Sequence, residues 1–365
     1  MKILCSKNDL LKGVNIALRA VPVRTTMTIL ECILIDASDD TIKFTSNDME
    51  LGIETTVDGE ILENGKIALD ARFLSDIVRK LPDSEVTIST DSNYNATISC
   101  EKMILSISGK SGDDFSYLPY IERDDYISIS QFALKEIIRQ TIFSIGDNES
   151  NKTMTGELFE INGNMLKVVS LDRYRVSIRN VELDGDYGTK SVIVPGKTLN
   201  EISKILSGEA DSTVKIYFEA NHILFEFDKT IVVSRLIEGE FIRISQMLDR
   251  NNKTKMTINK KVLLDCIDRA TLLVKEGNKQ PAIFNVTDGA LNINIVSSFG
   301  SMNEDIDITK EGDDIKIGFD PKFLIDALRV IDDENISIYF MSSKAPCTIK
   351  DDKGSYTYLI LPVNY

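Results

Sequence analysis

The chain has 365 residues, of which 42% are hydrophobic, and this is enough material for two or three ordinary cores. Its net charge of −15 argues against a protein that binds nucleic acid through a uniformly basic surface. Its five cysteines lie far apart and form no CxxC pair, which excludes a disulfide framework or zinc site and favours a reducing compartment. The N-terminus has no signal-peptide pattern and no long apolar run occurs, so we expect a cytoplasmic protein without a membrane span.

The first third of the chain predicts two helices, the second of which is followed by strands. The segments 6–21 (SKNDLLKGVNIALRAV) and 70–81 (DARFLSDIVRKL) have a helical pattern. β-Branched residues alternate with other residues in the strands that follow, which are predicted at 85–90, 96–100 and 103–108. Residues 91–95 are typical of a hairpin turn.

The rest of the chain repeats that order. Further helices are predicted at 130–145, 195–206, 259–274 and 320–331. Further strands are predicted at 213–218, 222–227, 230–236, 335–340, 347–350 and 356–362, with a hairpin turn at 351–354. The charged, proline-containing segment 117–125 and the polar segment 247–255 separate the repeats. We therefore expect three domains, at 1–122, 123–250 and 251–365.

The helical segments recur at the interval of a whole domain. DARFLSDIVRKL, PGKTLNEISKIL and DPKFLIDALRVI begin at residues 70, 195 and 320, so successive copies lie 125 residues apart. In the weaker set, which begins at residues 6, 130 and 259, Leu10, Leu134 and Leu263 occupy the same position. An interval this long is the size of a domain and not of a solenoid unit. The sequence predicts three tandem similar domains of the α+β class, each with two helices packed on antiparallel sheet.

Positive charge is concentrated on the predicted helices. Each of the six helical segments, counted over 6–21, 71–81, 130–145, 196–206, 259–274 and 321–331, has a net charge of +1 or +2, although the chain as a whole is acidic. One interpretation is that lysine and arginine are good helix formers that solvate an exposed face. The other is that the helices face a polyanion together, while the acidic strands and loops face elsewhere.

The sequence contains no recognisable catalytic or metal-binding pattern. The single histidine, His222, is expected in a turn before a strand and not as a general base. PGKT at 195–198 ends like a phosphate-binding loop, but that motif needs a glycine where Ser191 stands. Pro195 is instead expected at an early helical position. We expect no cofactor and no metal.

Leu171–Arg175 (LDRYR) is a charged and aromatic run directly after an apolar strand. It is consistent with an ordinary strand end whose exposed Asp–Arg pair contributes less than about 1 kcal/mol. It is equally consistent with a peptide-binding hot spot, because such sites favour tyrosine and arginine beside apolar positions. The residues alone leave both interpretations open.

Taken together, these segments resemble the bacterial DNA polymerase sliding clamp, the beta subunit of the replicative DNA polymerase III holoenzyme. The resemblance runs from Met1 to Tyr365 and keeps the spacing of three domains. It is carried by RTT at 24–26 with IL at 29–30, TSNDME at 45–50, residues 67–81, TGELF at 155–159, residues 171–176, 192–206 and 234–241, and LPV at 361–363.

The resemblance implies two subunits joined head to tail in a closed ring of six similar domains, lined by helices and enclosed by a continuous sheet. Helices that line the hole would face the phosphates of duplex DNA, which explains their mild positive charge and requires no reading of bases. Because topology would hold such a ring on DNA, an acidic outer surface is no obstacle.

The resemblance also implies which residues contact DNA and partners. DNA would be contacted by Arg24, in a turn after the first helix, and by a weaker set: Lys12, Arg72, Arg79, Lys80, Arg139, Lys197, Lys204 and Lys260. A groove between the second and third domains would bind short motifs of the polymerase alpha subunit, the clamp loader and other clamp-motif proteins. Its residues would be Met154, Leu171, Arg173, Tyr174, Arg175, Val176, Ile242, Gln246, Met247, Pro346, Leu361, Pro362 and Val363.

Ring closure would use the strand 103–108, whose apolar residues on one face would pack against the other subunit. The residues implied at this contact are Lys102, Leu105 and Ile107 on one side and Leu272, Leu273, Glu304 and Asp305 on the other. The alternative for each aliphatic side chain is a place in an ordinary core.

Three segments depart from the family pattern. Phe241–Ile244 reads FIRI where the family usually has FPDY, and Arg173-Tyr174 stands where it often has Gly or Ser followed by His. Asn364 replaces a penultimate basic residue. We expect the groove to be present but reshaped.

The sequence thus predicts a homodimeric sliding clamp that acts as a non-catalytic processivity factor. One alternative is a triple-repeat peptide-binding scaffold that does not encircle DNA. The other is an enzyme that uses carboxylates in an inter-domain cleft, which the missing base, metal cluster and phosphate loop argue against.

Overall fold

The computed structural model describes residues 1–147, 151–248, 252–274 and 280–364, apart from the side chain of Gln246. The chain forms two compact units. The first unit consists of residues 1–135 and 197–236, and the second consists of 136–196 and 237–365. The predicted boundaries at 122 and 250 stay predictions.

The helices begin and end close to the predicted positions. They are α1 (Lys7–Ala17), α2 (Ala71–Lys80), α3 (Gln131–Thr141), α4 (Gly196–Ile205), α5 (Ser245–Leu248), α6 (Lys260–Thr271) and α7 (Pro321–Val330). Except for α4 and the short α5, each follows a Ser, Asp or Asn whose side chain accepts a hydrogen bond from a backbone N–H of the first turn. Such caps satisfy donors that the helix leaves unpaired, which explains why the helices start where they do. No helix in the described part of the chain is both long and apolar enough to cross a membrane.

The first unit contains a five-stranded and a nine-stranded antiparallel sheet, in the orders β5-β1-β7-β8-β9 and β10-β6-β2-β3-β4-β18-β17-β16-β11. Its strands are β1 (Lys2–Ser6), β2 (Cys32–Asp36), β3 (Ile42–Asn47), β4 (Leu51–Val57), β5 (Glu60–Glu63), β6 (Lys66–Asp70), β7 (Glu85–Thr90), β8 (Asn95–Cys100), β9 (Met103–Ser108), β10 (Lys110–Ser111), β11 (Tyr126–Ser130), β16 (Thr213–Phe218), β17 (His222–Phe227) and β18 (Thr230–Arg235).

The second unit contains a nine-stranded and a four-stranded antiparallel sheet, in the orders β15-β12-β13-β14-β27-β26-β25-β19-β23 and β22-β21-β20-β24. Its strands are β12 (Gly156–Asn162), β13 (Met165–Leu171), β14 (Arg175–Glu182), β15 (Thr189–Pro195), β19 (Thr254–Asn259), β20 (Ala282–Thr287), β21 (Ala290–Ser297), β22 (Gly300–Asp307), β23 (Thr309–Gly312), β24 (Ile315–Phe319), β25 (Asn335–Phe340), β26 (Cys347–Lys350) and β27 (Tyr356–Ile360).

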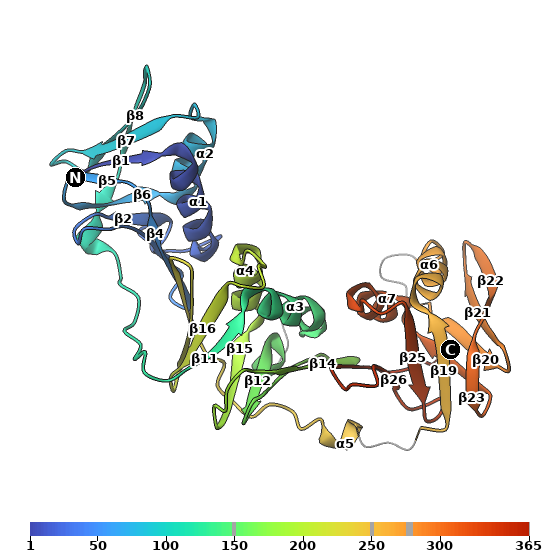
Figure 1. Cartoon of the computed structure of the whole chain (residues 1–365). Helices are drawn as coiled ribbons and strands as arrows, with labels where there is room; N and C mark the ends of the chain where they lie inside the picture. Colours follow the sequence, from blue (N-terminus) through green and yellow to red (C-terminus); the bar gives the residue numbers. More distant parts are fainter. Residues whose placement is uncertain (148–150, 249–251, 275–279, 365) are drawn as a thin grey trace. The chain divides into compact units, whose positions relative to one another are not determined.

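Helices pair side by side in each unit and bury their apolar stripes. Helix α1 lies beside α2 in the first unit, and α6 lies beside α7 in the second (Figure 1). Leu10 and Leu263, the equivalent residues of α1 and α6, are both fully buried in hydrophobic clusters with strands of their own unit. The predicted α+β architecture with helix pairs on antiparallel sheets is confirmed.

Several predicted ends of elements were wrong by one to four residues, and two of them have a clear physical reason. Pro195 does not lie in the helix; it ends β15, where it pairs with Gly156, and α4 begins at Gly196. Proline is tolerated there because β15 is the edge strand of its sheet. Strand β27 ends at Ile360 and not at Pro362. The Leu361 N–H donates to the Tyr174 carbonyl oxygen at 2.8 Å, in register with β14, and Pro362 has no N–H with which to continue the ladder.

A buried carboxyl group lies between α3 and β12 in the second unit. Glu157 is fully buried, and burial raises the pKa of its carboxyl to about 8. Thr141 Oγ1 lies 2.7 Å from the Ile137 carbonyl oxygen and 3.0 Å from Glu157 Oε2. A hydroxyl has one proton, and the carbonyl can only accept it. Both contacts are hydrogen bonds when Glu157 is protonated and donates to Thr141.

We predict that this carboxyl makes the protein less stable as the pH rises. A raised pKa in the folded state contributes stability that is fully present below the unfolded pKa of about 4.3 and is lost as pH rises through about 8. Between pH 6 and 8 the free energy of unfolding should fall by up to about 1.4 kcal/mol per pH unit. Urea unfolding of the parent and of Glu157→Gln checks this, because the neutral amide should flatten the slope. Equal slopes in both proteins would contradict the assignment.

Candidate functional site

The hairpin between β13 and β14 is closed by one carboxylate. Asp172 Oδ1 accepts hydrogen bonds from the Tyr174 N–H at 2.7 Å and the Arg175 N–H at 3.0 Å. The Asp172 N–H in turn donates to the Arg175 carbonyl oxygen at 3.1 Å. Aspartate at the start of a turn satisfies backbone donors in this way. The arrangement fixes where the side chains of Tyr174 and Arg175 leave the sheet.

Arg175 is a buried cation that is compensated on every side. Its side chain donates to Asp172 at 3.0 Å and to Asp326 of α7 at 2.6 Å. The guanidinium carbon lies 5.3 Å from the centre of the Phe143 ring and 4.8 Å from that of Phe323. A buried charge is tolerated when it is paired in this way. Arg175 is therefore a fixed part of the site wall.

An apolar cluster continues this wall. Of the predicted groove residues, Leu171 and Val176 are buried in one cluster with Ile178, Ile244 and Leu359, and Met154 and Ile242 pack against it. Tyr174 is 38% exposed and stacks on Phe323 at 5.5 Å between ring centres. The structure thus brings the turn, the segment before α5 and the end of β27 together.

The remaining predicted groove residues are exposed or half-buried, or lie outside the described part. Arg173 is exposed, Pro346, Pro362 and Val363 are half-buried, and Met247 is 36% exposed. Leu361 is half-buried beside the turn through its bond to Tyr174. The side chain of Gln246 lies outside the described residues.

The sequence analysis missed three residues that complete the site, namely Phe143, Phe323 and Asp326. They lie just after α3 and in α7, far from the turn in sequence, and only folding brings them to Arg175. The one signal in the sequence was that Phe323 and Asp326 belong to a recurring helix.

The nine predicted DNA-binding cations fall into three groups. Lys12, Arg24 and Lys80 are exposed and make no ion pair within the described part of the chain. Arg72, Arg79 and Lys260 donate to the neutral oxygens of Val23, Asn15 and Ile331, so they keep their full charge. Arg139, Lys197 and Lys204 are paired with the carboxylates of Glu136 and Asp332, Asp48, and Glu201. The cations of the first two groups are not neutralised by a carboxylate of the described residues, so they should attract a polyanion most strongly.

The hydrogen bond from Arg72 to Val23 anchors the turn in which Arg24 lies. Arg72 Nη2 donates to the Val23 carbonyl oxygen at 3.1 Å, so α2 holds the turn that carries Arg24. Arg24 therefore projects from an anchored segment although it is exposed itself.

Strands β9 and β22 each form an open edge of a sheet. Strand β9 ends the five-stranded sheet of the first unit, and β22 ends the four-stranded sheet of the second. Edge strands have unpaired backbone groups that can continue a sheet into another chain. Leu105 on β9 is 36% exposed, whereas Ile107 packs against the core; Ile104, which the sequence analysis did not select, is 72% exposed.

The residues predicted to meet β9 lie on or near β22. Leu272 is 82% exposed, and Leu273 is half-buried. The Arg269 guanidinium donates to Glu304 at 3.1 Å and lowers the pKa of that carboxyl. Asn292 donates to Asp305 at 2.7 Å. Both acidic residues therefore already have partners in their own chain, and Lys102 is exposed.

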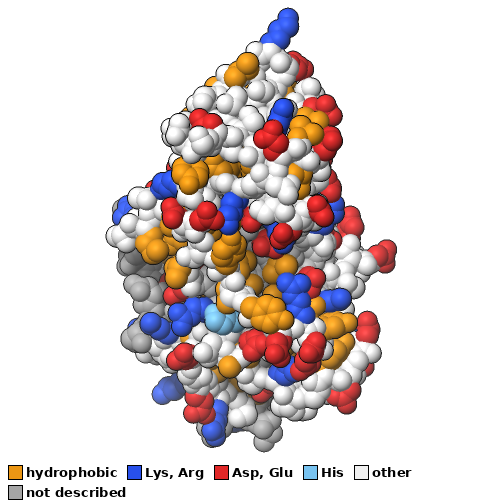
Figure 2. Space-filling view, turned by 90° about the vertical axis from the view of Figure 1, so that its left-hand side faces the viewer, with side chains coloured by type: hydrophobic (Ala, Val, Ile, Leu, Met, Phe, Trp, Pro, Cys, Tyr) orange, Lys and Arg blue, Asp and Glu red, His pale blue; other side chains and the backbone are white. Residues whose placement is uncertain are grey.

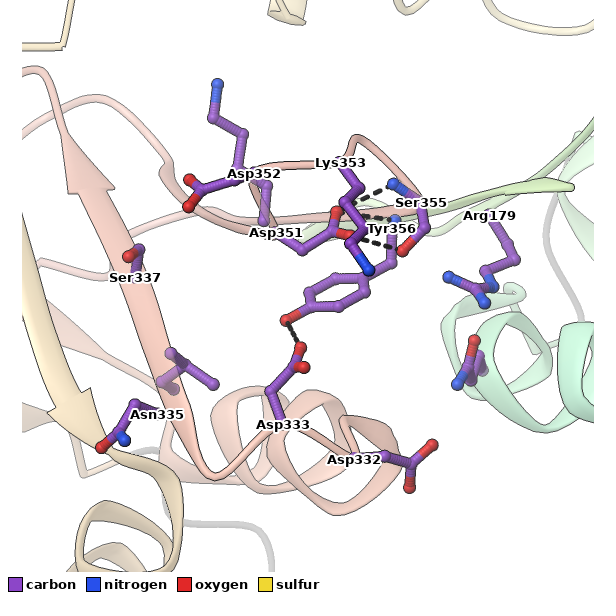
Figure 3. A pocket seen from close by; sticks show the side chains of 13 residues that line it. Arg179, Asp332, Asp333, Asn335, Ser337, Asp351, Asp352, Lys353, Ser355 and Tyr356 are labelled. Atoms are coloured by element: carbon purple, nitrogen blue, oxygen red, sulfur yellow. Dashed lines mark hydrogen bonds between the residues drawn. The ribbon is translucent and has the colours of Figure 1, made fainter.

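A polar pocket of about 390 Å³ lies in the second unit (Figure 3). Two of its carboxylates are engaged by hydroxyl donors of the protein: the Tyr356 hydroxyl donates to Asp333 at 2.6 Å, and the Ser355 hydroxyl donates to Asp351 at 2.6 Å. Burial, together with the bond to Asp333, raises the pKa of the Tyr356 phenol. No group of three or more His, Cys, Asp or Glu side chains among the described residues is placed to hold a metal ion.

Family models match the chain in three consecutive parts. The DNA polymerase III beta subunit N-terminal domain matches residues 1–119, the central domain matches 128–242 and the C-terminal domain matches 245–364. The beta sliding clamp of Staphylococcus epidermidis is 33% identical over 374 residues, which cover 100% of this chain and 99% of that protein. The clamp of Staphylococcus aureus is 33% identical over 375 residues with the same coverage.

Solved structures agree with these matches. A putative DNA polymerase III beta subunit from Eubacterium rectale has 64% identity and a TM-score of 0.98, with full coverage of both chains. The DNA polymerase sliding clamp from Bacillus subtilis has 32% identity and a TM-score of 0.97, and covers 100% of this chain and 99% of that one. With all three domains matched in order over its whole length, this chain belongs to the beta sliding clamp family of DNA polymerase III beta subunits.

Proposed function

We propose that this protein is a processivity clamp that closes with a second copy into a ring around duplex DNA and tethers a DNA polymerase. The observation that carries the proposal is the match of all three beta-subunit domains, in order, over the full chain. In this role it is a non-catalytic accessory subunit that acts in the cytoplasm.

The distribution of charge supports the role of the helices. Each long helical segment has a small net positive charge in a chain of −15. The cations with most charge to offer include Arg24 and Lys12, which make no ion pair within the described residues. Attraction to phosphates without base contacts permits movement along DNA, since it is the same at every position.

The open edges support head-to-tail closure. We propose that β9 of one protomer pairs with β22 of another, so that the sheets continue across the joint. Ile104, Leu105 and Leu272 supply exposed apolar surface at these edges. Each copy offers both edges, and a head-to-tail contact between two copies forms a closed ring when the rotation that relates them closes.

The apolar cluster beside Arg175 supports a peptide groove. It has a buried apolar floor and a rim that carries Tyr174, which is the composition of a hot spot for short linear motifs. We propose that the polymerase alpha subunit, the clamp loader and other clamp-motif proteins compete for it. A scaffold that binds peptides without encircling DNA would share this groove but would not form a closed ring.

We predict topological retention on DNA. After loading onto a nicked circle by its clamp loader, the protein should stay bound in high salt, because the ring must open before it can leave. Cutting the circle should release it, and gel filtration of the labelled protein before and after cutting measures this. Salt-sensitive binding that does not change on cutting would favour the scaffold instead.

We predict that Leu105→Asp yields monomers, because a carboxylate at the β9 edge would be buried without a partner in the joint. Leu62→Asp is the matched control, since Leu62 is 45% exposed on β5, the opposite edge of the same sheet. Sedimentation velocity should show a dimer for the parent and the control and a monomer for Leu105→Asp. A dimer in all three would remove Leu105 from the joint.

We predict that Leu361→Ala weakens binding of a clamp-motif peptide from the polymerase alpha subunit by about 2 kcal/mol, or roughly thirtyfold, if Leu361 is a hot-spot residue. Met165→Ala is the control, because Met165 is 40% exposed at the far end of β13. Fluorescence anisotropy with the labelled peptide gives both affinities. Unchanged affinity of the Leu361 variant would place the groove elsewhere.

A further inference from the structure

The first unit contains a second hairpin with the same closure as the hairpin that holds Arg175. Asp48 Oδ1 accepts from the Glu50 N–H at 3.0 Å and the Leu51 N–H at 2.8 Å, as Asp172 does from Tyr174 and Arg175. The Asp48 N–H donates to the Leu51 carbonyl oxygen at 3.0 Å. The two aspartates lie 124 residues apart, which is the interval between the first two repeats.

The strands around both hairpins have the same register. Gly52 pairs with Val233 of β18, as Val176 pairs with Leu359 of β27. The Arg235 N–H donates to the Glu50 carbonyl oxygen at 2.8 Å, which repeats the bond from Leu361 to Tyr174 at 2.8 Å. Arg235 therefore takes the place beside the Asp48 hairpin that Leu361 has beside the Asp172 hairpin.

A further segment closes the second site. The Asn47 side-chain amide donates to the Ser116 carbonyl oxygen at 2.8 Å and anchors the chain that follows β10. Leu118 then lies directly over Gly52, where a Cβ atom would come within 2.1 Å of a Leu118 methyl carbon. Leu118 and Ile242 again differ by 124 residues. The arrangement of hairpin, neighbouring strand and covering segment that surrounds the groove beside Arg175 therefore occurs a second time, around Asp48. We call this arrangement the frame.

This second frame surrounds a pocket of about 100 Å³ that has no role in the function proposed for this protein. Leu51 and Val233 are buried in its floor, Met49 is 56% exposed at its edge, and His222 and Arg235 lie on its rim. Figure 2 shows the single histidine on this face with basic and hydrophobic side chains next to it.

The rim of this pocket differs in charge from the wall of the groove beside Arg175. Arg175 is buried and neutralised by two carboxylates, whereas Arg235 is exposed and its guanidinium has no partner among the described residues. Glu50 is the one carboxylate that lines the pocket. An exposed, unpaired guanidinium beside an apolar floor is complementary to a carboxylate attached to an apolar group.

We propose that this pocket is a second peptide-binding site, which takes a small aliphatic side chain next to an acidic residue. An apolar cavity of about 150 Å³ accommodates benzene, so a smaller one favours a branched aliphatic side chain over an aromatic ring. The aliphatic side chain fills the space above Leu51 and Val233, and the flanking carboxylate pairs with Arg235. The proposal does not depend on ring closure or DNA, and goes beyond the function proposed above.

The test uses the fact that His222 is the only histidine. With ¹³C-labelled histidine in the full-length protein, the one imidazole signal reports on the pocket without assignment. The probes are the peptides acetyl-Asp-Leu-Asp-amide and acetyl-Lys-Leu-Lys-amide, titrated at fixed pH. The acidic peptide should shift the signal to saturation, and the basic one should not.

Two variants make the result specific. Arg235→Glu should weaken the acidic peptide at least tenfold, while an unchanged melting curve shows that the exposed substitution leaves the fold intact. Leu361→Ala, at the equivalent place in the first groove, should leave the response unchanged. The proposal is overturned by an absent shift at millimolar peptide, by equal shifts with both peptides, or by loss of the response in Leu361→Ala.

Discussion

The hairpin closed by an aspartate is the constraint on which the groove beside Arg175 and the pocket beside Arg235 both depend. Where two paired strands turn, several backbone N–H groups lose their ladder partners, and leaving them unpaired is costly. Asp48 and Asp172 each accept two of these donors, which locks the turn and the direction of the side chains after it. The neighbouring strand then bonds back to the turn at the same place in both hairpins. The frame is set by backbone chemistry, so the side chains on it are free to differ.

The two frames differ in where an arginine lies and in how its charge is compensated. Beside the Asp172 hairpin, the guanidinium of Arg175 is buried, and the carboxylates of Asp172 and Asp326 with the rings of Phe143 and Phe323 offset its desolvation. That leaves the neighbouring surface apolar. Beside the Asp48 hairpin, Leu51 occupies the buried position, and an arginine, Arg235, lies on the exposed rim instead. One frame therefore presents an apolar groove and the other an apolar pocket with a charged edge.

Local patterns predicted the long helices and nine of the strands, and left the other strands unpredicted. Strands β7, β9, β16 and β17 begin and end at the predicted residues, because alternation and turn chemistry are local properties. The errors came where tertiary pairing overrides a local preference, as at Pro195, which an edge strand accommodates. For the site, the sequence selected Leu171, Val176 and Arg175 from one short run. It missed Phe143 and Phe323, because no local pattern shows that a distant ring will lie against Arg175.

The sequence by itself determined the threefold repeat, the α+β class, the charge on the helices and the family. The first three follow from periodicity and composition, and the family follows from a resemblance of motifs; all of these are properties of the chain read in order. Only the tertiary structure decided which cations are neutralised, as Arg139 is by Asp332, and which strands are left as edges. It also decided that the first repeat builds a second pocket. Salt bridges, edges and pockets join residues distant in sequence, and their geometry exists only once long-range packing has brought those residues together.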